Sequence, residues 1–167
     1  MKTRIFVYLF AFVGLLASCS SHKTSAYGPR QSVIVNAEAG GVYAVEARGR
    51  AIKHDVLETS RYEAMTACKR QAVMDVLFEI LPTRNMVEKT MKPVLMEVNI
   101  KQKQEDYFNA FFAGKDKGTW HDYVKSTGTR AAAPKFSETA NEMVCDMVVY
   151  VDRAGLKARM KADGILP

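Results

Sequence analysis

Residues 42–81 have the sequence VYAVEARGRAIKHDVLETSRYEAMTACKRQAVMDVLFEIL, and this stretch decides the fold. Its first part alternates small or apolar side chains with charged ones. The small or apolar set is Tyr43, Val45, Ala47, Gly49 and Ala51, and the charged set is Glu46, Arg48 and Arg50. A period of two places the sets on opposite faces of an extended chain, so we predict a half-buried β-strand over 42–52.

The second part predicts a long helix over residues 55–81. Asp55 and Glu58 have the spacing of a capping box, and Pro82 halts the helix. Small or apolar residues recur every four positions at Ala64, Cys68, Ala72 and Val76. A stripe of such small side chains predicts that the helix packs closely on a sheet.

The flanking segments extend this strand and helix. Residues 31–37 are rich in β-branched side chains, and Gly40-Gly41 separates them from 42–52, which predicts a β-hairpin. Residues 141–151 predict another strand, and its apolar face is Met143, Cys145, Met147, Val149 and Val151. Residues 152–163 predict a final helix with Leu156 and Met160 inward and Gly164 as its stop.

Residues 82–130 predict an irregular helical insert. Pro82 and Pro93 interrupt it, and 94–100 suits either a short strand or an irregular run. A short helix is expected from about 104 to Gly114, a helical piece over 120–124 and a loop over 125–135. The expected class is therefore α+β: one domain over 31–167, with a mainly antiparallel sheet, a long helix packed on one face, the insert and a C-terminal helix.

The first residues have the pattern of an export signal. Lys2 and Arg4 precede an apolar run over 5–16, which is short for a membrane span. Leu16-Ala17-Ser18-Cys19 then resembles the lipobox of bacterial lipoproteins, which implies cleavage after 18 and a lipid on Cys19. An ordinary secretory signal with a chance cysteine, or an uncleaved anchor, stays open. Residues 19–30 are small and polar and predict a flexible tether.

The resemblance to lipoproteins also predicts a location. Ser20 after the cysteine favours the outer membrane, with the periplasmic face preferred and the cell surface possible. Loss of Lys2 and Arg4 with the signal leaves 22 of the 24 basic residues, against 18 acidic ones. This mild excess is no footprint of nucleic-acid binding, so we expect no nucleic-acid partner.

Few residues suggest catalytic chemistry. The cysteines and histidines lack the spacing of metal ligands, so neither a metal nor a cofactor is expected. His121-Asp122 resembles an oriented base, yet no Gly-x-Ser-x-Gly elbow accompanies it, and a histidine in a polar turn is the preferred interpretation. Arg48 and Arg50 suggest an anion site or, more simply, a solvated strand face. The stripe Arg153, Lys157 and Lys161 suggests a solvated helix face or a contact with a membrane surface.

Two other residue sets carry structural or binding hypotheses. The insert concentrates six aromatic residues, which suit either core filling or a contact surface for a partner: Tyr107, Phe108, Phe111, Phe112, Trp120 and Tyr123. Cys68 and Cys145 fall on faces that would meet if the long helix lies on the sheet. A disulfide and two free buried thiols both remain open.

Residues 42–167 resemble small envelope-lipoprotein domains, namely penicillin-binding-protein activator lipoproteins and the N-terminal domain of the flagellar T protein. The features that carry this resemblance are the strand ending in 46–51, the small helix residues around Cys68, and residues 148–165. Val76-Leu77-Phe78, Tyr107-Phe108 and Phe111-Phe112 also resemble uncharacterised lipoproteins of Bacteroides-like bacteria. The resemblance implies an adaptor or assembly role and assigns no site residue.

These observations lead to one functional expectation and two alternatives. We expect a non-enzymatic, membrane-anchored envelope lipoprotein that binds another envelope protein, through the aromatic insert or a sheet edge. The alternatives are a regulator of a peptidoglycan synthase and an envelope hydrolase that uses His121 and Asp122.

Overall fold

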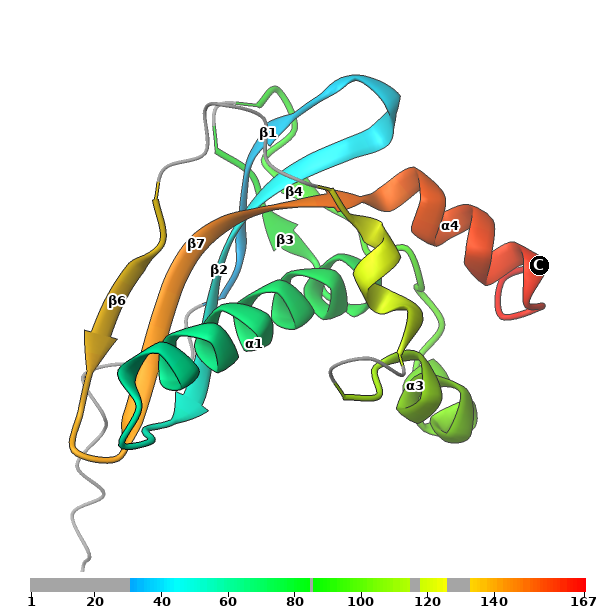
Figure 1. Ribbon diagram of the computed structural model, residues 1–167. Coiled ribbons are helices and arrows are strands. Elements are labelled where there is room, and N and C mark those ends of the chain that lie inside the picture. Colours follow the sequence, from blue (N-terminus) through cyan, green and yellow to red (C-terminus); the bar gives the residue numbers. More distant parts are fainter. Residues whose placement is uncertain (1–30, 85, 115–117, 126–132) are drawn as a thin grey trace, which may run out of the picture.

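The computed structural model describes residues 31–84, 86–114, 118–125 and 133–167. Its centre is a pair of long antiparallel strands, β2 (Val42–Ile52) and β7 (Glu142–Asp152), which pair along their whole length. β1 (Val33–Ala37) pairs with the other side of β2. β5 (Val124–Lys125) and β6 (Lys135–Glu138) pair with the free side of β7, so the sheet order is β1-β2-β7-β5, with β6 also on β7 (Figure 1).

The predicted hairpin is confirmed, and glycine makes its turn possible. A short 3-10 turn, η1 (Ala39–Gly41), connects β1 to β2. Gly40 and Gly41 have φ angles of 79° and 80°. Residues with a Cβ rarely adopt such angles, so the glycine pair permits the tight reversal.

The long helix α1 (Leu57–Phe78) lies across one face of the sheet, as predicted (Figure 1). Its small residues Ala64, Cys68 and Ala72 are fully buried against that face. The closest approach is at Gly49 of β2. A Cβ built there would lie 2.1 Å from the Cys68 backbone nitrogen and 2.4 Å from the Ala64 carbonyl oxygen. The helix backbone therefore rests directly on the strand, which only a glycine allows.

The predicted ends of α1 are partly wrong. The N-cap position is Val56, and no side chain caps the helix there, so the capping box of Asp55 and Glu58 does not form. The preceding turn is closed instead by Ser60, whose Oγ accepts a hydrogen bond from the His54 backbone nitrogen at 2.8 Å. The helix also ends at Phe78, because Leu81–Pro82 form strand β3, which pairs with β4 (Thr90–Met91).

The C-terminal end of α1 holds the insert. The last carbonyls of a helix have no partner within it. Here the Val94 nitrogen donates to the Val76 carbonyl at 3.1 Å, and the Leu95 nitrogen to the Leu77 carbonyl at 2.9 Å. Of the two alternatives for 94–100, the irregular run is the one observed, and it is fastened to the end of α1.

The rest of the insert is helical, with one difference from the prediction. It contains α2 (Ile100–Lys103), α3 (Glu105–Phe111) and the 3-10 helix η2 (Thr119–Tyr123). Its last described part, β5, belongs to the main sheet. Neither β5 nor β6 was predicted, because two or four residues carry too little alternation to distinguish a strand from a loop.

The final helix α4 (Arg153–Ala162) agrees closely with the prediction. Asp152 caps it, since its Oδ1 accepts a hydrogen bond from the Gly155 nitrogen at 2.7 Å. Leu156 and Met160 are fully buried, and Gly164 ends the helix with a φ angle of 72°. Within the part of the chain that the structure describes, every helix falls short of the length or apolar character that a membrane span needs.

One buried carboxyl group joins the start of the domain to α1. The Ser32 hydroxyl donates to Asp75 Oδ2 at 2.5 Å, and Gln71 Nε2 donates to Asp75 Oδ1 at 2.7 Å. Ser32 and Asp75 are 1 % and 8 % exposed. Burial raises the pKa of Asp75, and the two hydrogen bonds oppose that rise only in part.

The close approach at Gly49 makes a prediction about stability. Gly49→Ala forces α1 away from β2, and overpacking of this kind costs about 1–3 kcal/mol. Because backbone atoms cannot move aside as a side-chain tip does, we expect a loss at the upper end of that range, measured by urea unfolding. Gly114→Ala is the matched control, because a Cβ there meets no atom within 4 Å. Equal stability of the two variants would contradict the close packing.

The raised pKa of Asp75 makes a prediction about pH. A folded-state pKa above the unfolded value means that the folded protein holds this proton more tightly. The contribution of protonated Asp75 to the free energy of unfolding is then fully present below the pKa that Asp75 has in the unfolded chain. It is lost as pH rises through the pKa that Asp75 has in the folded protein. We expect Asp75→Asn to gain stability relative to the wild type between about pH 4 and pH 7. Denaturant unfolding at both values checks this, with the exposed Glu58→Gln as control. A free energy of unfolding of Asp75→Asn that stays constant or falls relative to that of the wild type as pH rises would refute it.

Candidate functional site

The aromatic residues of the insert are core residues, and this corrects the predicted contact surface. Phe108, Phe111, Phe112 and Trp120 are between 2 % and 4 % exposed. Phe108 packs edge-on against Phe78 of α1, with 5.0 Å between ring centroids. Four of the six rings thus attach the insert to the domain. For these four, core filling is the alternative that the structure has.

The two remaining aromatic residues, Tyr107 and Tyr123, are half-buried at the edge of this cluster. The Tyr107 hydroxyl donates to Asp163 Oδ2 at 2.6 Å, beside the Arg159 guanidinium. The hydrogen bonds from Tyr107 and Arg159 lower the pKa of Asp163. Tyr107 therefore joins α3 to the end of α4, which is a structural task.

His121 and Asp122 do not have the surroundings of a catalytic pair. His121 Nδ1 lies 3.1 Å from the Gly118 carbonyl oxygen, and the imidazole stacks on Trp120 at 3.8 Å between centroids. A carbonyl and an indole are thus the neighbours of the ring. Among the described residues, no group of three or more His, Cys, Asp or Glu side chains is arranged to hold a metal ion.

The structure brings the two predicted cysteines together. Cys145 pairs with Gly49 across the sheet, and Cys68 lies over that glycine on α1. Both thiols are free and fully buried, so of the two alternatives the structure has the unbridged one. The hydrogen bond with Cys145 and burial both raise the pKa of the Cys68 thiol, which also lies 3.1 Å from the Ala47 carbonyl oxygen. A thiol with these properties is an inert core group.

The arginines of β2 also have structural partners. Arg48 and Asp146 face each other across the sheet and form a bidentate pair, with N–O distances of 2.8 Å and 2.9 Å. Arg50 lies 3.6 Å from Glu142. These cross-strand pairs occupy the sheet face opposite α1. They account for Arg48 fully, whereas Arg50 Nη2 is buried without a hydrogen-bond partner among the described residues.

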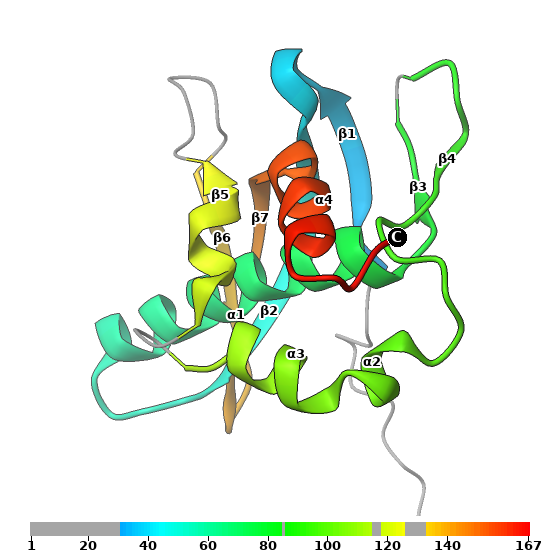
Figure 2. The same cartoon turned by 90° about the vertical axis from the view of Figure 1, so that its right-hand side faces the viewer.

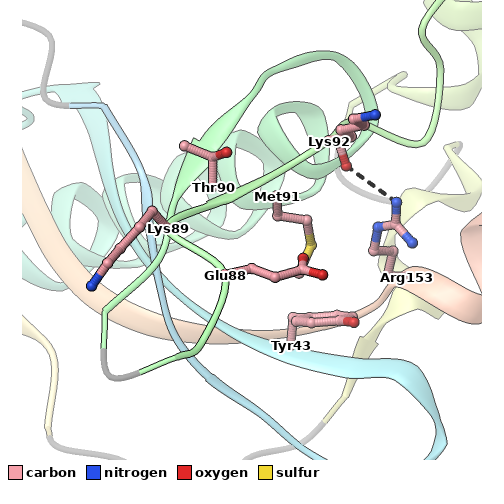
Figure 3. A pocket seen from close by; sticks show the side chains of 7 residues that line it. All are labelled: Tyr43, Glu88, Lys89, Thr90, Met91, Lys92 and Arg153. Atoms are coloured by element: carbon pink, nitrogen blue, oxygen red, sulfur yellow. Dashed lines mark hydrogen bonds between the residues drawn. The ribbon is translucent and has the colours of Figure 1, made fainter.

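A hollow that the sequence did not predict lies between β2, the β3–β4 hairpin and α4. Its volume is about 600 Å³ (Figure 3). Seven residues line it: Tyr43, Glu88, Lys89, Thr90, Met91, Lys92 and Arg153. Figure 3 shows the Tyr43 ring on one side of it and the Glu88 carboxyl between Met91 and Arg153. We call this feature the basic hollow, because three of its residues are cationic and one is acidic.

Arg153 is held at the back of the basic hollow by the chain that forms it. Its Nη2 donates to the Lys92 carbonyl oxygen at 3.1 Å, which fixes the guanidinium between α4 and the hairpin. Its Nε is buried and has no hydrogen-bond partner in the described structure. A buried donor without an acceptor costs about 1–3 kcal/mol. Because Nε itself is covered by the surrounding chain, a ligand in the basic hollow reaches only the part of the guanidinium that lines it.

In the sequence, Arg153 forms a stripe with Lys157 and Lys161 on one helix face. Lys157 and Lys161 are exposed, as a solvated face requires. Arg153 differs because a hairpin distant in sequence, residues 88–92, folds over its side chain. No local signal marks such a contact, so the sequence alone had no means of finding the hollow.

The remaining predicted site residue, Cys19, lies outside the described residues, as do the predicted signal 1–18 and the tether up to residue 30. No protein-family model, no curated protein and no solved structure matches this chain.

Proposed function

We propose that this chain is a membrane-anchored envelope lipoprotein that acts as a non-enzymatic binding module. The basic hollow takes an acidic group of another envelope protein. The observation that carries this proposal is the Arg153 guanidinium, which lines the hollow and is held in place by the Lys92 carbonyl oxygen. The lipobox residues Leu16 to Cys19 supply the anchor.

The charges of the basic hollow indicate what it binds. Lys89, Lys92 and Arg153 provide three positive charges against the single carboxylate of Glu88. Arginine donors form their strongest hydrogen bonds with carboxylates and phosphates, so a carboxylate is a suitable ligand for the Arg153 guanidinium. Glu88 disfavours a ligand that is purely anionic. A peptide segment that carries an acidic side chain next to neutral or basic groups fits this balance better.

The remaining walls favour a peptide as well. The Tyr43 ring and the Met91 side chain give the basic hollow an apolar side, which suits the body of a side chain rather than its charge. The β3–β4 hairpin supplies the other lining residues, and its Lys89 and Lys92 side chains are exposed. The open, polar shape suits a protein surface loop better than a small cofactor.

Membrane attachment removes the need for high affinity. Two proteins confined to one surface meet at a high effective concentration, which raises a modest contact affinity without new contacts. One carboxylate bound by Arg153 and two exposed lysines is such a modest contact. The hydrolase alternative has less support, because the contacts of the His121 ring among the described residues are with the Gly118 carbonyl oxygen and the Trp120 ring.

The proposed anchor is tested through Cys19. In cells given labelled palmitate, the wild-type protein is expected to take up label and to fractionate with membranes. Cys19→Ala removes the only thiol that can carry the lipid at the lipobox, so label and mature form should both disappear. Ser18→Ala keeps a small residue before the cysteine and is the matched control. Unlabelled wild-type protein with an intact signal would overturn the anchor.

The proposed binding hollow is tested with two charge-matched double variants. Lys89→Glu with Lys92→Glu reverses the rim of the hollow, whereas Lys157→Glu with Lys161→Glu makes the same charge change on the outer face of α4. All four side chains are exposed, so both variants should fold. In-cell crosslinking followed by mass spectrometry should show at least about a tenfold loss of the captured partner for the first variant only. Equal capture by both variants would remove the hollow from the proposal.

A further inference from the structure

Three exposed apolar side chains gather where the described chain begins. Ile80, Met96 and Val98 are 59 %, 68 % and 78 % exposed, and all three line one hollow of about 380 Å³ beside α2. We call these three residues the apolar rim. An exposed apolar group of this kind marks a surface that contacts either another protein or a lipid.

The loop that carries Met96 and Val98 is attached to the domain at both ends, and this attachment keeps the two side chains exposed. Val94 and Leu95 before them are buried, and their backbone nitrogens bond to the end of α1. Ile100 after them is buried as well. Asn99, between Val98 and Ile100, has a left-handed φ angle of 64°, which turns the chain back into the domain. Residues 96–98 must therefore project outward between fixed ends.

The start of the domain lies beside the apolar rim. Gln31 Nε2 donates to the Ile80 carbonyl oxygen at 3.0 Å, so the chain enters the domain next to Ile80. Residues 20–30 connect this point to Cys19. A flexible chain of that length spans roughly 20 Å on average. A lipid on Cys19 thus keeps this part of the domain near the bilayer.

A second set of exposed apolar residues lies too far away for the same role. Val56, Leu57 and Tyr62 belong to the other end of α1. A helix of 22 residues is about 33 Å long, which exceeds the average reach of the tether. The position at which the chain enters the domain therefore distinguishes two otherwise similar apolar surfaces, because only the apolar rim lies beside it.

The charges around the apolar rim also suit an anionic bilayer. Lys101 lies over the Phe78 ring, 5.6 Å from its centroid, and is exposed, as is its neighbour Lys103 on α2. Glu97 pairs with Lys103, so these two charges cancel and Lys101 leaves residues 94–103 with a net charge of +1. Lysine near a membrane surface adds attraction to acidic lipids.

We infer that the apolar rim inserts into the head-group region of the membrane to which Cys19 attaches the domain, and so orients the domain on it. This inference rests on the proposed lipid anchor. In Figures 1 and 2 the β3–β4 hairpin extends away from the end of the molecule that carries α3, and Figure 2 places α2 at that same end. Docking through the apolar rim therefore turns the basic hollow away from the bilayer, toward a partner.

The test uses the full-length lipoprotein in vesicles of phosphatidylethanolamine and phosphatidylglycerol. Val98→Cys receives a polarity-sensitive fluorophore; Val56→Cys, at the other end of α1, is the matched control. Cys68 and Cys145 are buried and do not compete for the label. We expect blue-shifted emission and quenching by brominated lipids at position 98 and neither at 56. Adding Ile80→Ser and Met96→Ser should reduce the quenching at 98 at least severalfold.

The outcomes separate the docking from the anchor. The mass of the vesicle-bound protein reports the lipid on Cys19 independently of the fluorophore. A lipidated protein whose label at 98 emits as in water overturns the docking and leaves the anchor intact. A protein without lipid overturns the anchor; because its Cys19 would then also take the label, Cys19→Ala with Val98→Cys is labelled instead, and quenching at 98 after simple addition of vesicles decides the docking. A label shielded only when another envelope protein is added assigns the apolar rim to a protein partner and overturns the inference.

Discussion

The rest of the structure depends on the contact between the backbone of α1 and Gly49 of β2. The missing side chain at this position lets the helix lie closer to the sheet than any other residue would allow, with Cys68 and Ala64 directly above the strand. This contact sets the distance between α1 and the strands β2 and β7, which are the longest of the described strands. Cys68 and Cys145 become neighbours as a result, and the core closes around them.

The position of α1 then determines where the insert can attach. The free carbonyls at the end of the helix accept hydrogen bonds from residues 94 and 95, and Phe78 receives the ring of Phe108. Asp75 fastens the first residues of the domain to the same end of the helix through Ser32. One helix end thus gathers the entry of the chain and the loop of the apolar rim, although 31 and 98 are distant in sequence.

The two proposed surfaces follow from this arrangement and suit different partners. The apolar rim lies beside the entry of the chain and consists of aliphatic side chains, which match a lipid surface. The basic hollow is formed by the hairpin and the start of α4, and it consists of cations around an aromatic ring. A domain held by a lipid, oriented by one surface and open at the other needs no catalytic group to recruit a protein.

The sequence by itself determined the elements that have many residues and a clear period. The alternation in β2 and β7, the small-residue stripe of α1 and the Leu156–Met160 spacing of α4 each repeat several times, so local chemistry was sufficient to predict them. The proximity of Cys68 to Cys145 was also foreseeable from the faces on which they lie, but the absence of a disulfide between them was not.

Only the tertiary structure decided whether the aromatic residues of the insert are buried and that Arg153 lines a hollow. Whether Phe111 is buried or exposed depends on which distant segment covers it, and the hollow around Arg153 exists because residues 88–92 fold over α4. Such contacts join segments that are distant in sequence, and neither segment has a local pattern that depends on the other. A local pattern therefore cannot predict them.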